Sequence, residues 1–250
     1  MKTISALLAA GLVLASALAG CGASPAAPAK QLRKTPVQQG ANPTINQAMP
    51  GVPGMVDPQI KQLLAAVAAT NQRAAGFTAV IDVQDKGPSE SGSQTLKVSF
   101  KKPNSLKIDI MKDSAGNDGV KALWAGASQM QVKPKFPPIT VSLDVSDKRL
   151  ISRNGWTIKD TGVSAIVGVL LNPQSQFKAL GDQPVGGKTL AMLEVRCPTS
   201  PKGATHEVIG IDRQTNLPGY RAVYRGQTLM YKLEMKSMKL TAPSATEMAI

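Results

Sequence analysis

Two short stretches of the sequence place a serine and a lysine at the spacing of a nucleophile and its base. Ser99-Phe100-Lys101-Lys102 and Ser175-Gln176-Phe177-Lys178 both match Ser-x-x-Lys, which acyl-transferring serine enzymes use. The first match falls on an alternating stretch that predicts a strand, where Ser99 and Lys102 point to opposite faces. The Ser-Asp-Asn and Lys-Thr-Gly motifs that accompany such a serine are absent. These pairs therefore predict no acyl-enzyme chemistry.

The other residues that could do chemistry stand apart from one another. His206 is the single histidine, with no motif carboxylate beside it, so we expect a structural or surface role. Gly-x-Ser-x-Gly, His-Glu-x-x-His and Cys-x-x-Cys are absent, which leaves no basis for a nucleophile elbow or a zinc site. Cys197 alternates with Leu193 and Val195 and is expected to be a small buried hydrophobe. The sequence predicts no enzyme, no catalytic residue, no metal site and no cofactor.

The second cysteine, Cys21, ends an N-terminal segment with the layout of a secretory signal. Lys2 precedes a mostly apolar run, Ile4 to Leu18, which is shorter than the roughly 20 apolar residues of a spanning helix. Leu18-Ala19-Gly20-Cys21 resembles the bacterial lipobox. The resemblance implies a signal peptide over residues 1–20 and lipidation of Cys21 after cleavage. An ordinary secreted protein with a chance cysteine and an uncleaved anchor are the alternatives.

Export changes what the basic composition implies. The chain carries a net charge of +13, which in an intracellular protein would suggest nucleic acid as a partner. Outside the cytoplasm the available anions are phospholipid headgroups, lipopolysaccharide phosphates and wall polymers, so we expect anionic headgroups and no nucleic acid. A charge that only maintains solubility is the alternative. The residue after Cys21 is Gly22 instead of Asp, which favours the outer membrane in a cell with two membranes.

Residues 21–56 are expected to form a lipidated disordered linker between the anchor and the folded domain. They contain no acidic residue and six prolines, together with many Ala, Gln and Gly. As a flexible chain this linker would span on the order of 30 Å. The domain is therefore expected to work at a distance from its anchor.

The hydrophobic periodicity over residues 57–242 predicts an α+β domain, followed by a tail at 243–250. Asp57 and Pro58 begin a helix with apolar residues at helical spacing as far as about Ala75. From Phe77 onward the period is two, and Pro103-Asn104 forms a turn between two strands. Further strands are expected at 119–125, 129–133, 139–144, 148–152, 156–159, 190–197, 206–212, 217–224 and 228–240. An uncharged helix, capped by Asp160 or Thr161, is expected at 162–171, with a buried strand as the alternative.

Several of these stretches resemble the LolA/LolB superfamily of periplasmic lipoprotein carriers and acceptors, which includes lipid-carrying lipoproteins of mycobacteria. The resemblance rests on Gly76-Phe77-Thr78-Ala79, on the strand, Lys-Pro-Asn turn and strand from Val98 to Ile108, on Gly119 to Trp124, and on Val208 to Pro218. It extends over about 57–242. It implies a strongly curved antiparallel sheet, a half-barrel, with helices packed on its concave face around a cavity for acyl chains.

The resemblance and the apolar pattern together give a hypothesis for the site. A membrane-anchored envelope lipoprotein would bind or transfer a lipid or acylated molecule in the cavity. The alternative is an RseB-like sensory or assembly module that binds a protein partner. The apolar residues expected to line the cavity, which otherwise form a plain core, are Val98, Phe100, Ile108, Ile110, Ile166, Leu170, Leu229 and Leu233.

Overall fold

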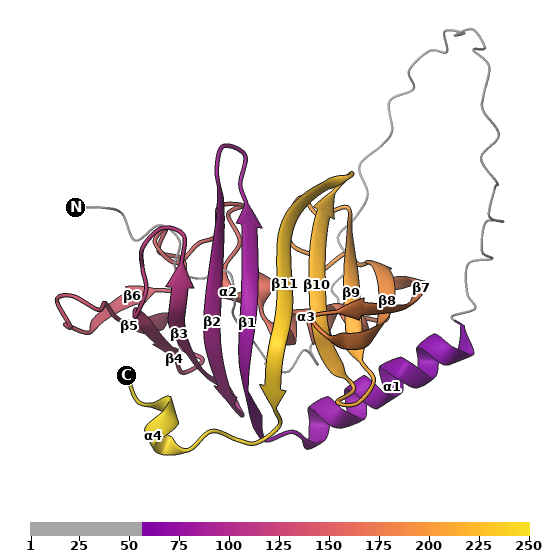
Figure 1. Cartoon of the computed structure of the whole chain (residues 1–250), viewed down its shortest axis with the longest axis horizontal. Helices are drawn as coiled ribbons and strands as arrows, with labels where there is room; N and C mark the ends of the chain where they lie inside the picture. The colour runs from indigo at the N-terminus through magenta and orange to yellow at the C-terminus, as the bar shows by residue number, and fades with distance from the viewer. Residues whose placement is uncertain (1–56) are drawn as a thin grey trace, which may run out of the picture. The chain divides into compact units, whose positions relative to one another are not determined.

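The computed structural model describes residues 57–250 (Figure 1). The signal peptide, Cys21 and the linker predicted from the sequence lie outside the described residues. No helix in the described part is both long enough and apolar enough to cross a membrane.

The first helix, α1 (Pro58–Arg73), begins and ends where its sequence predicts. The carboxylate of Asp57 accepts a hydrogen bond from the backbone N–H of Gln59 at 2.8 Å, and proline occupies the first turn. At the other end, the ammonium of Lys102 donates to the carbonyls of Asn71 and Gln72 at 2.7 and 2.9 Å. These contacts satisfy carbonyls that the end of a helix leaves without intrahelical partners. The lysine of the first Ser-x-x-Lys match therefore caps a helix.

The strands form one open sheet in which every neighbouring pair is antiparallel, as the sequence predicts. The spatial order is β6-β5-β4-β3-β2-β1-β11-β10-β9-β8-β7, so β1 and β11 join the two halves of the chain at the middle of the sheet. The central strands run up the view in Figure 1, whereas β5 to β8 near the two ends lie across it. The strands are β1 (Gly76–Lys86), β2 (Ser91–Lys101), β3 (Ser105–Asp113), β4 (Lys121–Trp124), β5 (Gln129–Lys133), β6 (Val141–Asp144), β7 (Gln176–Val185), β8 (Lys188–Arg196), β9 (His206–Asp212), β10 (Leu217–Arg225) and β11 (Thr228–Lys239).

Two helices follow β6 and precede β7. The short α2 (Ile158–Thr161) leads into α3 (Val163–Leu171), which confirms the helix predicted at 162–171 and rules out the buried strand. The predicted cap is wrong: Gly162 occupies the cap position of α3 without a side-chain hydrogen bond. Asp160 instead lies in α2 and binds the residue that precedes this helix, since its carboxylate accepts from the backbone N–H and the hydroxyl of Thr157 at 2.7 and 2.8 Å.

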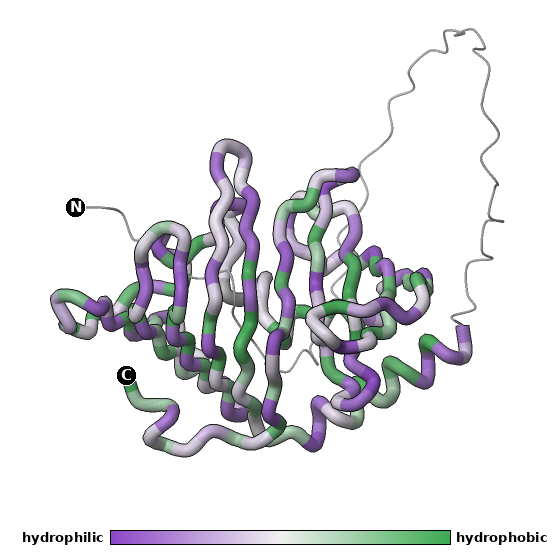
Figure 2. The backbone as a smooth tube through the Cα atoms, viewed as in Figure 1, coloured by the Kyte–Doolittle hydropathy of each residue, from purple (hydrophilic) through white to green (hydrophobic). Residues whose placement is uncertain are grey.

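Hydrophobic and hydrophilic residues alternate along the strands (Figure 2), which gives the sheet an apolar face. The buried apolar side chains form two clusters. The first cluster lies mainly on β1 to β5 and the neighbouring part of β11, and it includes Ile81, Leu96 and Trp124. The second lies between α1, α3 and strands β8 and β9, and it includes Val67 and Ile209. The two helices thus cover only one half of the sheet.

Over the other half, the covering element is the segment 145–157, which we call the cover segment. It places Leu150 and Trp156 in the first cluster, each 2% exposed. The buried carboxylate of Asp85 holds this segment by accepting hydrogen bonds from Arg153 N at 2.7 Å and from Asn154 Nδ2 at 2.6 Å. The strands predicted at 148–152 and 156–159 are therefore wrong, because their apolar residues pack onto the sheet instead of joining it.

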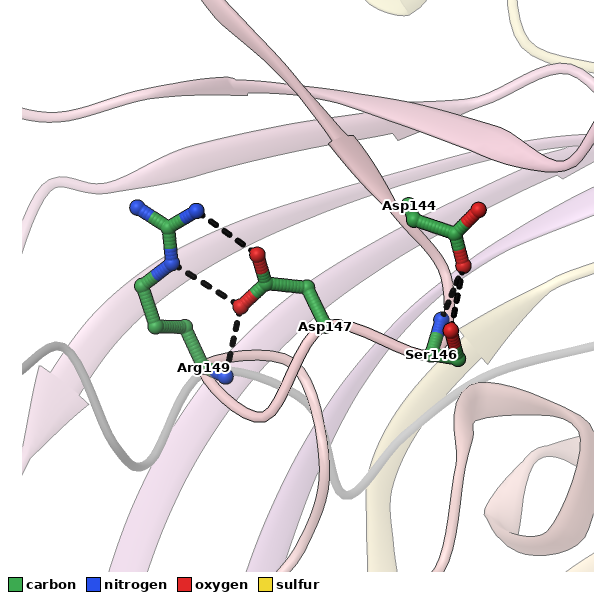
Figure 3. Close-up of polar contacts among 4 residues, drawn as sticks. All are labelled: Asp144, Ser146, Asp147 and Arg149. Atoms are coloured by element: carbon green, nitrogen blue, oxygen red, sulfur yellow. Dashed lines mark hydrogen bonds and ion pairs between the residues drawn. The ribbon is translucent and has the colours of Figure 1, made fainter.

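The cover segment begins with two turns closed by side chains (Figure 3). Asp144 Oδ1 accepts from the backbone N–H of Ser146 at 2.8 Å. The carboxylate of Asp147 accepts from Arg149 N at 2.9 Å and from Arg149 Nη2 at 2.7 Å, and the guanidinium holds the pKa of this carboxyl well below its usual range.

The tail predicted at 243–250 contains a short helix, α4 (Ala245–Met248). Ser244 and Glu247 cap it reciprocally, since Ser244 N donates to Glu247 Oε2 at 2.8 Å and Glu247 N donates to Ser244 Oγ at 3.2 Å. The ammonium of Lys107, a buried side chain of β3, donates to the carbonyl of Glu247 at 2.9 Å. The tail is thus tied to the sheet.

Candidate functional site

An open groove lies between the first half of α1 and strands β7 and β8, and we call it the α1 groove. Its volume is about 690 Å³, within the roughly 300–1,000 Å³ typical of ligand pockets. Apolar side chains of the helix and the strands line it, among them Ile60, Leu63, Ala66, Ala179, Ala191, Met192 and Leu193. Polar residues also line it, namely Asp57, Gln59, Gln62, Asp182, Arg213 and Asn216.

The space in the groove follows from small residues on its strand side. Ala179 and Ala191 face the helix with single methyl groups, and Gly181 has no side chain. The ladder between β7 and β8 shifts register between Ala179 and Gly181, and Gly181 adopts a φ of 81°, which favours glycine. A Cβ placed on Gly181 would meet no atom within 4 Å. The groove therefore stays open because no large side chain fills it.

The polar part of the groove is organised by an ion pair between β7 and the turn after β9. Arg213 Nε lies 3.1 Å from Asp182 Oδ2, and Arg213 Nη2 lies 2.8 Å from Asp182 Oδ1. Both side chains are largely exposed, so the pair contributes little to stability, on the order of 0–1 kcal/mol. Its hydrogen bonds raise the pKa of the Arg213 guanidinium. An exposed cation and anion thus lie beside the apolar residues of the α1 groove.

The eight residues predicted to line an acyl cavity do not come together in one cavity. Five lie in the first cluster, two lie in the second, and Leu229 belongs to neither. Leu229 is half-buried because the pairing of β10 with β11 shifts register after Val223, which places Met230 and Tyr231 in the core instead. The members of the first cluster are Val98, Phe100, Ile108, Ile110 and Leu233, and those of the second are Ile166 and Leu170.

Of these eight, Phe100 also lines a small apolar pocket at the junction of α3 and the sheet. The pocket has a volume of about 20 Å³ and is lined in addition by Phe77, Val163 and Leu217. The rings of Phe77 and Phe100 pack with their centroids 5.5 Å apart. This volume is room for about one water-sized probe and not for an acyl chain. The interior cavity stays a prediction.

A buried polar centre lies on the sheet beneath α2. Arg221 on β10 and Glu207 on β9 form an ion pair with Nε and Oε2 2.6 Å apart, and both side chains are 0% exposed. Arg221 Nη1 also donates to the carbonyl of Asp160 at 2.8 Å. The hydroxyl of Tyr231 approaches the carbonyl of Thr161 at 3.5 Å, and burial raises the pKa of this phenol. The centre ties the sheet to α2 at the start of α3.

The isolated residues with catalytic chemistry are engaged elsewhere. The His206 ring stacks on Tyr224 with centroids 4.9 Å apart. Ser175 Oγ donates to the carbonyl of Val169 at 2.6 Å, and Ser99 is buried. Cys197, expected to be buried, is half-buried, with its sulfur 3.1 Å from Thr199 Oγ1. In the described part of the chain, no three His, Cys, Asp or Glu side chains are arranged to hold a metal.

Most of the α1 groove was not anticipated from the sequence. Its helical wall belongs to the amphipathic face that was recognised, but its floor on β7 was missed. The apolar run from Leu190 to Leu193 and the small residues Ala179 and Gly181 were the available signals. They indicate where β7 and β8 lie only after the helix has been placed against them.

No family model and no curated protein sequence matches this chain. Several solved structures are similar to it. An uncharacterised conserved protein from Thermus thermophilus has a TM-score of 0.48 and 10% identity, over 77% of this chain and 94% of that one. The Mycobacterium tuberculosis lipoprotein LppX has a TM-score of 0.45 and 12% identity, over 72% and 94%. A LolA superfamily protein from Nitrosomonas europaea has a TM-score of 0.39 and 12% identity, over 76% and 97%.

One of the three structures is named as a LolA superfamily protein, the superfamily that the sequence resembles. The identities are 10–12% and the TM-scores are below 0.5, so none of these similarities indicates what this chain binds. What the chain binds must therefore follow from its own residues.

Proposed function

We propose that this chain is a membrane-tethered envelope protein, without enzymatic activity, that binds a lipid or an acylated molecule with its acyl part in the α1 groove. The observation that carries the proposal is the groove itself, an open space of about 690 Å³ with an apolar wall and a polar edge. An amphiphile needs both kinds of surface.

The two sides of the groove suit the two parts of such a ligand. Leu63, Ala66 and Ala179, which are half-buried or exposed, offer aliphatic surface to an acyl chain, whose transfer from water is favourable by about 0.8 kcal/mol for each buried CH₂ group. Arg213 and Asn216 stand at the same groove and offer hydrogen-bond donors to a headgroup. Binding therefore requires no covalent chemistry.

The ligand-binding space would become larger if α3 moved outward. In a half-barrel whose concave face is covered by α1 and α3, the groove is continuous with the second cluster, because Ile60 and Leu193 belong to both. The helix α3 has no charged residue and buries Ile166 and Leu170 against this cluster. An outward shift of α3 would extend the groove toward the residues predicted to line the cavity.

Lipidation of Cys21 and the linker that follows supply the membrane tether in this proposal. With a reach on the order of 30 Å, the linker lets the groove meet lipids or acylated proteins while the chain stays attached. The extracytoplasmic face is proposed on the same sequence evidence. Recovery of the mature protein with diacylglycerol on its N-terminal cysteine would support the tether, and an unmodified cysteine would contradict it.

The second candidate is a module that binds a protein partner, and the free edge of the sheet favours it. Among the strands of residues 57–250, β7 pairs only with β8, and most of its ten residues are exposed. An extended peptide could add to this edge and place side chains in the adjacent groove. Gly181 and Pro184 make the edge irregular, which opposes such pairing, so we place this candidate second.

Native mass spectrometry of the chain starting at residue 22, after incubation with a fatty acid or phospholipid, tests the proposal. Ala66 lines the groove and Ala65, its neighbour, is exposed and does not line it. We expect Ala66→Trp to fill the groove and remove the lipid adduct, whereas Ala65→Trp keeps it. Equal binding by both variants would place the ligand elsewhere, and a stoichiometric protein partner without lipid would support the second candidate.

A further inference from the structure

The tip of the β5–β6 hairpin exposes large apolar side chains that belong to neither cluster of the described residues. Phe136 is 89% exposed and Ile139 is 63% exposed. The hairpin projects from the β6 end of the sheet, at the left of Figure 1. Exposed aromatic and aliphatic residues gathered at a projecting tip are typical of a surface that binds something.

Three prolines and a backbone hydrogen bond restrict the conformation of the tip. Pro134, Pro137 and Pro138 fix three of its backbone φ angles, and the N–H of Ile139 donates to the carbonyl of Pro137 at 2.8 Å. The fixed φ angles limit the backbone conformations in which Phe136 could fold back onto the sheet. Because Phe136 and Ile139 are already exposed before any partner binds, less conformational entropy is lost when they bind it.

The lysine side chains near the tip indicate that its partner is anionic. Residues 119–143 contain no acidic residue, and Lys121, Lys133 and Lys135 are their charged side chains. Lys135 lies against the neighbouring β3–β4 loop, where a Cβ on Gly119 would meet its Cδ at 3.1 Å. The nearest acid along that loop, Asp118, accepts a hydrogen bond from Asp113 N at 2.6 Å. The projecting surface is thus apolar at its end and basic at its base.

We propose that residues 134–139 insert into the interface of an anionic lipid bilayer, with Phe136 and Ile139 among the upper acyl groups and Lys133 and Lys135 at the phosphates. Aromatic and aliphatic side chains favour this depth, and lysine side chains extend from it to anionic headgroups. This membrane site is separate from the α1 groove and does not depend on what the groove binds.

The position of the tip gives the domain two attachment points at opposite ends. The chain enters the fold at Asp57, which lines the groove beside β7, whereas the tip adjoins β6 at the other end of the sheet. A protein held only by its N-terminal linker can rotate freely. Insertion of the tip would instead lay the long direction of the sheet along the bilayer.

Co-sedimentation of the chain starting at residue 22 with lipid vesicles tests the site, using phosphatidylcholine with and without phosphatidylglycerol. We expect binding that requires phosphatidylglycerol and is weakened at least about tenfold by Phe136→Ser with Ile139→Ser. The matched control is Leu171→Ser with Leu240→Ser, since these leucines are 40% and 42% exposed elsewhere. The control is expected to bind as the unmodified chain does.

The charge requirement has its own pair of variants. Lys133→Gln with Lys135→Gln is expected to weaken binding to the anionic vesicles more than Lys61→Gln with Lys178→Gln, which removes two lysines at the groove end. The basic residues of the linker are the same in all variants. Equal weakening by the two pairs would mean that net charge alone attracts the vesicles, and would overturn the proposal.

Insertion depth separates a membrane site from a contact between two copies of the chain. In a Phe136→Trp variant, lipids brominated on their acyl chains should quench the added fluorescence, while Trp124 and Trp156, each 2% exposed, give the constant background. The absence of quenching would overturn the proposal. So would a dimer in sedimentation that the Phe136→Ser with Ile139→Ser variant abolishes, with vesicle binding unchanged.

Discussion

Arg221 on β10 donates from Nε to Oε2 of Glu207 on β9 at 2.6 Å, and neither side chain is exposed to solvent. The guanidinium also donates to the carbonyl of Asp160 in α2. Two other atoms of the pair, Glu207 Oε1 and Arg221 Nη2, have no hydrogen-bond partner among the described residues. Burying such groups costs free energy, so the pair stabilises the fold less than its short distance suggests.

The first prediction concerns this ion pair. Arg221→Met leaves the Glu207 carboxylate buried and alone, so we expect the free energy of unfolding to fall by about 3–5 kcal/mol. The double variant Arg221→Met with Glu207→Leu removes both charges and should recover most of the loss. Urea denaturation of the single and double variants measures this coupling. Losses that simply add would show that the two side chains do not act as a pair.

The second prediction concerns pH and Asp85. Burial is the main cause that raises the pKa of this carboxyl above 3.8, and hydrogen bonds from Arg153 and Asn154 oppose it. Below the unfolded pKa both states are protonated. As pH rises from there through the folded pKa, the unfolded chain releases its proton first, so stability is lost over that window.

Asp85→Asn cannot ionise and should lack this loss. The difference in unfolding free energy between the unmodified chain and the variant is therefore expected to shift against the unmodified chain as pH rises from about 3 to about 7. Denaturant titrations of both proteins across that range measure it. A difference that stays constant with pH would show that Asp85 titrates normally.

The third prediction concerns the helix that covers the second cluster. Gly168 lies in α3, is exposed, and a Cβ there would meet no atom within 4 Å. We expect Gly168→Ala to stabilise the helix by about 0.5–1 kcal/mol, because alanine loses less backbone entropy. A rise in Tm of about 1–4 °C in calorimetry would follow for a domain of this size.

Gly76→Ala provides the contrast. A Cβ at Gly76 on β1 would overlap the backbone carbonyl oxygen of Phe100, which cannot move without disturbing β2, so we expect a lower Tm. If both alanine variants changed Tm in the same direction, the packing described for one of them would be wrong.

The fold was predictable where local pattern and packing agree. Ile60, Leu63 and Val67 recur at helical spacing, and α1 forms there because the same face packs in the second cluster. Val98 and Phe100 alternate with polar residues, and β2 forms there. In α1 and β2, the apolar residues that recur at helical or alternating spacing are the ones that pack in the two clusters.

The errors arose where a residue's partner is distant in sequence. Leu150 and Trp156 have the spacing of strand residues, but the contact of Asp85 with Asn154, 69 residues apart, holds them over the sheet as a cover. The strand β7 was missed because an edge strand with mostly exposed residues carries little apolar alternation. The groove was missed because β7 forms part of it, and because the space depends on how α1 packs against β7 and β8.

Photocrosslinking with a fatty acid that carries a diazirine on its acyl chain tests the central claim most directly. After irradiation and digestion of the chain starting at residue 22, we predict labelled peptides from α1 around Leu63 and from β8 around Leu193, with labelling lost in Ala66→Trp and kept in Ala65→Trp. Labelling confined to the tip at residues 134–139, or spread evenly over the surface, would contradict an acyl site in the α1 groove.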